Sequence, residues 1–208
     1  MLSPARALRT SILSVLLAAC SGSAEPLDVA LDSSAPDVGP PAVDAGPTPF
    51  ALTSTAYEEG GTIPLRHECG PPIVADGPGE NISPQLAWTA GPPSTMSYAI
   101  VMRDRDAGNL VHWVIYDIPP GVRALSDGIA AWYAVVDPAG AHQAEIQGSG
   151  WFGFLGPCSS GSVNTYEIAL HALSTPTLAG VDRGTSEDDV AAAIEAASIA
   201  VATLRGES

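Results

Sequence analysis

Short apolar runs separated by Gly and Pro clusters characterise the chain from Phe50 onward. This texture is typical of an all-β domain, because strands need only a few residues and Gly and Pro favour the turns between them. The run 111–118 is nearly all apolar, which predicts a central strand covered on both faces. The predicted strands are Tyr98–Arg103, Val111–Ile118, Trp132–Val136 and Thr165–Leu173.

One helix is predicted near the C-terminus, from about Glu187 to Leu204. Ser186 and Asp189 have the spacing of a capping box, and the acidic residues of the first turn complement the helix dipole. Gly206 is expected to stop the helix. The apolar stripe of this helix consists of Val190, Ile194, Ala197, Val201 and Leu204.

The first 19 residues predict an export signal. Arg6 and Arg9 precede an apolar run over 12–17, which is too short for a membrane span of ~20 residues. The run ends in Leu-Ala-Ala-Cys, which resembles the lipobox of bacterial lipoproteins and implies that Cys20 becomes the lipidated N-terminus. The alternative is an ordinary signal peptide with a chance cysteine. The first interpretation predicts a protein anchored by lipid to the bacterial cell envelope, in the outer membrane if the cell is Gram-negative.

Composition and charge extend this picture. Residues 20–49 are rich in Pro and Ala and carry only acidic charges, which predicts a disordered tether before a domain at 50–208. The chain has no lysine and a formal net charge of −15. This charge speaks against nucleic-acid binding, because that binding rests on cationic side chains.

The two cysteines of the domain are Cys69 and Cys158. An even pair in an exported domain favours a disulfide. Two buried free thiols are the alternative, because the sequence does not show the geometry that a bridge needs.

Several short motifs follow one another across residues 50–206. They are GENISPQLAW at 79–88, Asp-Arg-Asp-Ala-Gly at 104–108, His-Trp-Val at 112–114 with Ile-Pro at 118–119, and Gly-Phe-Leu-Gly-Pro-Cys at 153–158 followed by Tyr166. In this order they resemble the phosphatidylethanolamine-binding protein family, in its bacterial Raf-kinase-inhibitor-like branch. The resemblance implies a mostly β fold, an antiparallel β-sandwich with a C-terminal α-helix.

The resemblance also implies a pocket for a small anion or a phospholipid head group. In such a pocket the amides of a Gly-Pro turn approach the anion, histidine and tyrosine donate hydrogen bonds, and acidic residues hold the histidine or the loop. Carried over by position, the ligand-binding residues are Asp104, Asp106, His112, Gly156, Pro157 and Tyr166.

The chain departs from the family pattern inside this pocket. Asn164 stands where the family has a second histidine, and residues 159–160 are Ser-Ser instead of Pro-Pro. Arg105 replaces a proline. It is expected to pair with Asp104 or Asp106, and a direct contact with the anion is the alternative.

The sequence therefore predicts a non-enzymatic, membrane-tethered binding protein without catalytic residues, metal or cofactor. Two aspartates at 104 and 106 have no third carboxylate nearby to complete a metal site. A Cys158–His112 hydrolase would require a free thiol, which conflicts with the predicted disulfide. The rival hypothesis is a protein-interaction or inhibitor module, acting on a protease or kinase, with a degenerate pocket. The resemblance alone also allows a homodimer.

Overall fold

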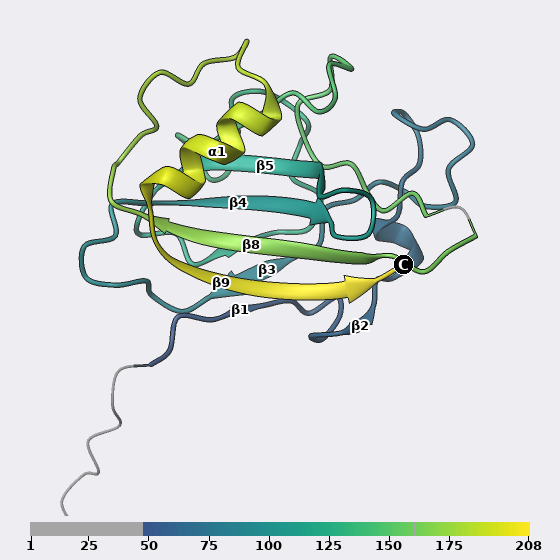
Figure 1. Ribbon diagram of the computed structural model, residues 1–208, viewed down its shortest axis with the longest axis horizontal. Coiled ribbons are helices and arrows are strands. Elements are labelled where there is room, and N and C mark those ends of the chain that lie inside the picture. Colours follow the sequence, from purple (N-terminus) through teal and green to yellow (C-terminus); the bar gives the residue numbers. More distant parts are fainter. Residues whose placement is uncertain (1–47, 160) are drawn as a thin grey trace, which may run out of the picture. The chain divides into compact units, whose positions relative to one another are not determined.

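The computed structural model describes residues 48–159 and 161–208 (Figure 1). The predicted signal, Cys20 and nearly all of the predicted tether lie outside the described residues. Within the described part, no helix is long and apolar enough to cross a membrane. The elements are β1 Leu52–Thr53, β2 Gly61–Thr62, a 3₁₀ turn at Leu65–His67, β3 Leu86–Trp88, β4 Ser97–Asp104, β5 Leu110–Ile118, β6 Ala124–Leu125, β7 His142–Gln143, β8 Thr165–Leu173, α1 Glu187–Ala197 and β9 Ser198–Glu207.

Two sheets form the described domain. The larger has six strands in the order β2-β9-β8-β4-β5-β7, and the smaller has the order β1-β3-β6. All pairs are antiparallel except β2 with β9. The predicted antiparallel sandwich is therefore confirmed, with one exception at the edge of the larger sheet.

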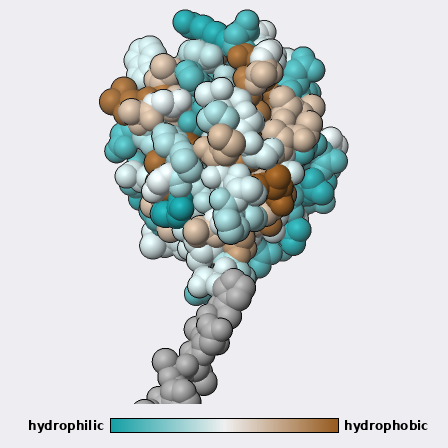
Figure 2. All heavy atoms as spheres, turned by 90° about the vertical axis from the view of Figure 1, so that its left-hand side faces the viewer, coloured by the Kyte–Doolittle hydropathy of each residue, from teal (hydrophilic) through white to brown (hydrophobic). Residues whose placement is uncertain are grey.

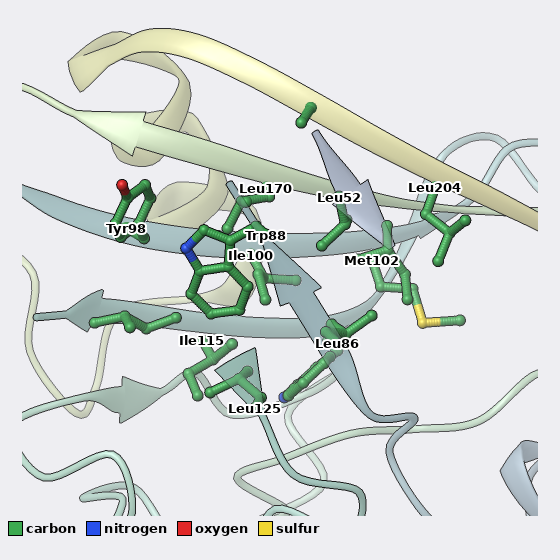
Figure 3. Packing of buried hydrophobic residues seen from close by; sticks show 14 of the residues in the cluster. Leu52, Leu86, Trp88, Tyr98, Ile100, Met102, Ile115, Leu125, Leu170 and Leu204 are labelled. Carbon is green, nitrogen blue, oxygen red and sulfur yellow. The ribbon is translucent and has the colours of Figure 1, made fainter. Parts of the chain in front are cut away.

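The larger sheet is covered on both faces (Figure 1). Along β4, Tyr98, Ile100 and Met102 point into a core shared with the smaller sheet, which contributes Leu86 and other residues (Figure 3). Ala99 and Val101 point into a second core beneath α1. This alternation follows from the pleat of a strand, in which successive side chains face opposite sides.

The nearly all-apolar run 111–118 has the burial that its sequence predicts. Trp113 and Ile115 belong to the core between the sheets, whereas Val114 and Tyr116 belong to the core under α1. This strand, β5, is second from one edge of the larger sheet, since only the short strand β7 lies outside it. The apolar run therefore predicts burial on both faces of the strand, but it does not predict the position of the strand in the sheet.

The predicted helix to Leu204 is too long. Ser186 caps α1 as expected, since its Oγ accepts a hydrogen bond from the amide of Asp189, but the helix ends at Ala197. Residues 198–207 form β9, which pairs with β8 along its length. Gly206 does not stop a helix: it lies in β9, where an added Cβ would meet Ile63 and a tyrosine ring.

The predicted strand Trp132–Val136 is absent from the described structure. Only a single bridge joins Ala134 to His142. The side-chain amide of Gln143 donates to the carbonyls of Ala130 and Trp132. A buried side chain therefore satisfies backbone groups that a strand partner would otherwise bind.

Several large apolar side chains are exposed on the described domain. The face in Figure 2 carries hydrophobic residues singly or in small groups among hydrophilic ones, which is ordinary for a soluble domain. The exposed side chains include Trp132 at 69% and Val136 at 81% in the irregular segment after β6, and Val201 at 50% on β9.

Candidate ligand-binding site

A cavity of about 400 Å³ lies at one end of the larger sheet. Asp104 reaches it from the end of β4, His112 from the start of β5 and Tyr166 from the start of β8. These three strands are neighbours in the sheet, so three of the predicted site residues meet although they are far apart in sequence. The other lining residues are Val74, Ala107, Leu110, Gln147, Leu155, Cys158, Ser159, Ser162 and Asn164.

His112 and Tyr166 form the wall of the cavity. Their rings pack edge to face with centroids 5.1 Å apart, a favoured aromatic geometry. His112 Nδ1 lies 3.1 Å from the carbonyl oxygen of Leu155. A carbonyl only accepts, so Nδ1 carries the proton and the neutral ring presents a lone pair at Nε2. Burial lowers the pKa of His112, although the carbonyls of Leu155 and Gly156 and the charge of Asp104 favour its protonated form.

Asp104 holds the loop rather than the histidine. Its Oδ1 accepts hydrogen bonds from the amides of Asp106 (2.9 Å) and Ala107 (3.0 Å), and its Oδ2 accepts from the side-chain amide of Asn164 at 2.8 Å. Burial opposes ionisation of this carboxyl. The hydrogen bonds from Asn164 and the two backbone amides outweigh it and lower the pKa of Asp104. The carboxylate is therefore ionised and its oxygens are engaged.

Asp106, Gly156 and Pro157 do not line the cavity. The carboxylate of Asp106 accepts from the amide of Thr165 at 2.7 Å and so ties the β4–β5 loop to β8. The amide of Gly156 donates to Asn81 Oδ1 at 2.8 Å, so it does not point to a bound anion.

Gly156 instead allows two chain segments to approach. A Cβ at this position would collide with the backbone of 67–69. Asn81, in the GENISPQLAW stretch, completes the contact: its Nδ2 donates to the carbonyl of Phe154 at 2.9 Å. Asn81 is a positioning residue that the sequence analysis missed, although it lies in a motif that was singled out.

The predicted disulfide is present and borders the cavity. Cys69 and Cys158 are bonded, with Cα atoms 5.3 Å apart, and the amide of Cys69 donates to the carbonyl of Pro157. The bond fastens the segment that carries Ser159 to the turn after the 3₁₀ helix. Because the sulfur of Cys158 is bonded, it has no thiolate to act as a nucleophile.

Arg105 does not form the expected pair with Asp104 or Asp106. Its guanidinium lies 3.9 Å from the carboxylate of Glu167, and it is absent from the cavity lining. Alternation along the chain explains this placement, because Arg105 points to the opposite side from Asp104. The contact is long and the Arg105 side chain is 45% exposed, so the pair contributes little to stability.

Comparison with known protein families identifies the family of this chain. The sequence pattern described as phosphatidylethanolamine-binding protein matches residues 53–208. The chain belongs to this family. The family is named for the binding of phosphatidylethanolamine.

Relatives of the phosphatidylethanolamine-binding protein family agree. A UPF0098 protein of Methanothermobacter thermautotrophicus is 34% identical over 160 residues, which cover 74% of this chain and 95% of the relative. UPF0098 protein YbhB of Escherichia coli is 31% identical over 65% of this chain and 84% of its own length. LppC of Mycobacterium tuberculosis, whose name classes it provisionally as a lipoprotein, is 29% identical over 76% of this chain and 71% of its own.

Among solved structures, the crystal structure of E. coli YbcL, described as a new member of the mammalian PEBP family, has a TM-score of 0.67 and 28% identity. The likeness covers 77% of this chain and 98% of YbcL. The matched region therefore makes up nearly all of the YbcL chain in that structure.

The cavity lining carries little formal charge. Among its described lining residues, Asp104 carries the only formal charge at neutral pH, since His112 is neutral. The other polar groups are neutral: the hydroxyls of Ser159 and Tyr166, 3.0 Å apart, and the amide of Asn164. Ser159 stands where the resemblance gives the family a proline, and the sequence alone did not predict a role for its hydroxyl.

Proposed function

We propose that the chain binds a small anionic or phospholipid-like ligand in the His112–Tyr166 cavity, without catalysis. The observation that supports this most directly is the meeting of His112, Tyr166 and Ser159 around one hollow at the sheet end. The Ser159–Tyr166 hydroxyl pair keeps one hydrogen that can be donated to a ligand oxygen, and His112 can donate from Nε2 once it is protonated. A cavity of about 400 Å³ has the size of a small-molecule site.

The anion binds together with a proton. The neutral imidazole of His112 has no hydrogen on Nε2, because Nδ1 already donates to Leu155. Protonation turns Nε2 into a charged donor and offsets the negative charge of Asp104. A zwitterionic head group also suits this charge distribution, because its ammonium group is attracted to the ionised carboxylate of Asp104 while its phosphate is attracted to protonated His112.

We therefore expect the affinity for phosphoethanolamine or a short-chain phospholipid to rise as the pH falls toward the pKa of His112, by up to about tenfold per pH unit. His112→Ala should reduce binding at least about tenfold and remove this pH dependence, and Tyr166→Phe should cost a smaller factor. Native mass spectrometry and isothermal titration calorimetry on residues 44–208, which form one compact unit, measure both effects.

Tyr133→Phe is the matched control, because it removes a phenol oxygen outside the cavity lining. Equal binding by wild type and His112→Ala would contradict the proposed site. Binding that is lost in His112→Ala but does not change with pH would contradict proton uptake and leave the site itself standing.

The second part of the proposal concerns anchoring. The Leu-Ala-Ala-Cys sequence and the acidic, Pro-rich stretch after it support a lipid anchor at Cys20, and the lipoprotein name of LppC agrees. We expect the intact chain, expressed in bacteria, to enter the membrane fraction with an acylated Cys20, and Cys20→Ala to be released from that fraction. Mass spectrometry of the N-terminal peptide distinguishes this from an ordinary signal peptide, which would leave an unmodified N-terminus.

A further inference from the structure

The strand β9 lies second from one edge of the larger sheet, inside the short strand β2. Most of the outer side of β9 is open (Figure 1). On one side it pairs with β8 from Ser198 to Glu207. On the other side β2 pairs only with Gly206 and Glu207. Within the described residues, no other strand pairs with the outer edge over 199–204.

The direction of the backbone groups on this edge follows from their neighbours. The amide of Arg205 donates to Glu59 Oε2 at 2.8 Å, and its carbonyl accepts from the amide of Gly60 at 2.9 Å, both outside the β8 pairing. In an antiparallel ladder, alternate residues point their N–H and C=O groups to the same side. Val201 and Thr203 therefore present theirs to the open edge, and no described residue binds them.

The side chains of this edge lack the features that keep exposed edges apart. Residues 198–204 read Ser-Ile-Ala-Val-Ala-Thr-Leu, without charge or proline, although the chain as a whole carries −15. Ile199 and Val201 are among the large hydrophobic residues that remain exposed. Free edges of natural sheets usually carry charges, prolines or bulges that prevent strand addition. Charges and prolines are absent from 198–204, and the single irregularity of the β8–β9 pairing falls at Ile199, before Val201 and Thr203. The edge over 201–204 is therefore able to accept a strand.

A cavity of about 340 Å³ adjoins the same edge, between β9 and β1. Its apolar lining comes from Leu52, Tyr57 and Leu204; Figure 3 shows Leu52 on β1 and Leu204 on β9 within one core. The hydroxyl of Tyr57 is buried without a partner, and the residue is 7% exposed. Glu58 and Glu59 form the polar end of the lining.

We propose that this edge binds an extended peptide segment of another protein, which adds to β9 as an antiparallel strand. The backbone of Val201 and Thr203 supplies up to two donors and two acceptors for the peptide. One apolar side chain of the peptide enters the cavity lined by Leu52 and Leu204. A basic side chain lies beside Glu58, because the acidic end of the cavity is complementary to positive charge.

A second copy of this chain fits the edge less well. Twofold antiparallel pairing of β9 with itself would set a serine or an alanine of the second copy opposite Leu204, since the inward positions of β9 hold Ser198, Ala200, Ala202 and Leu204. Neither side chain fills a cavity of about 340 Å³. An apolar residue from a different sequence does, so the cavity favours a peptide over self-association.

The test uses a fluorescent, amidated octapeptide with two N-terminal lysines followed by alternating leucine and threonine. An antiparallel orientation places its N-terminal residues beside Thr203 and Glu58. We expect saturable one-to-one binding to residues 44–208 by fluorescence anisotropy. N-methylation of alternate peptide amides on the edge that faces β9 should weaken binding at least tenfold, whereas N-methylation of the opposite edge should leave it unchanged.

Two protein variants test the same contacts from the protein side. Val201→Pro removes an amide that faces the open edge and is not needed for the β8 ladder, so it should weaken binding at least tenfold. Val201→Thr, which keeps the amide, is its control. Glu58→Gln should weaken binding of the lysine peptide about threefold and leave a lysine-free peptide unaffected.

Three outcomes would overturn the proposal. One is equal binding of the two N-methylated peptides, which would mean non-specific hydrophobic attachment. Another is the absence of binding at millimolar peptide. The third is a dimeric wild type in sedimentation that Val201→Pro converts to a monomer, which would make the edge an interface between copies of this chain.

Discussion

Removal of the disulfide between Cys69 and Cys158 should lower the free energy of unfolding by about 4–5 kcal/mol. The bond joins residues 89 positions apart, and closing a loop of this length restricts the unfolded chain by about that amount in the chain-entropy model. For a domain of this size, the same loss corresponds to a fall in Tm of roughly 10–18 °C. Denaturant unfolding of residues 44–208 with both cysteines changed to Ala measures the difference.

The controls separate the bond from the substitutions. Wild type in excess reductant should unfold like the double variant, and reductant should leave the double variant unchanged. A midpoint that is the same for oxidised wild type and the double variant would show that the bond does not form in solution. Because Cys158 lines the cavity, loss of the bond should also weaken ligand binding, through greater freedom of the segment that carries Ser159.

The parts of the fold that sequence could predict are those with a strong local signal. The run 111–118 has no polar interruption at its core, and 165–173 has nearly continuous β-forming residues; both are strands with the expected C-terminal ends. The cap at Ser186 is likewise local, because it needs only Asp189 three residues later.

Failures came where distant residues decide the local structure. Val201 and Leu204 continue a helical stripe from Val190 and also fit an alternating strand, so the pattern alone allows both. Pairing with β8 decides for the strand. In the same way, Gln143 satisfies the carbonyls of 130 and 132 from outside that segment, and nothing in the sequence of 132–136 shows this.

The site residues also differ in how far the sequence could predict their positions. The motif order placed Asp104, His112 and Tyr166 in one region, and the structure brings them around one cavity. The partner of Gly156 is Asn81, 75 positions away. A Gly-Pro turn is compatible with amides that face a ligand or with amides that bind another loop, and only the packing of 67–69 against Gly156 distinguishes the two.

Substitution of Asp104 should have the largest effect of any single residue at the site outside the disulfide. Asp104→Ala leaves the amides of Asp106 and Ala107 and the side chain of Asn164 without their acceptor. Buried groups that lose a charged partner cost about 3–5 kcal/mol in total. Denaturant unfolding at pH 7 measures this loss, and a cost below about 1 kcal/mol would show that solvent or the loop replaces the missing contacts.

The pH dependence of that loss has a defined sign. The pKa of Asp104 is lowered in the folded state, so the ionised carboxylate contributes stability above its unfolded pKa of about 3.9, and this contribution disappears as the pH falls through the folded pKa. The stability gap between wild type and Asp104→Ala should therefore be constant from about pH 5 to 7 and shrink below about pH 4.

An exchange of the two side chains tests the hydrogen bond itself. Asp104→Asn opposes two amide groups, and Asn164→Asp opposes two carboxylates, so each alone should destabilise the domain. The double variant restores one carboxylate facing one amide across the 2.8 Å contact. It should recover at least about 1 kcal/mol relative to the sum of the single changes. Strict additivity would mean that Asp104 and Asn164 act separately, and that Asp104 stabilises the domain through the backbone of its loop alone.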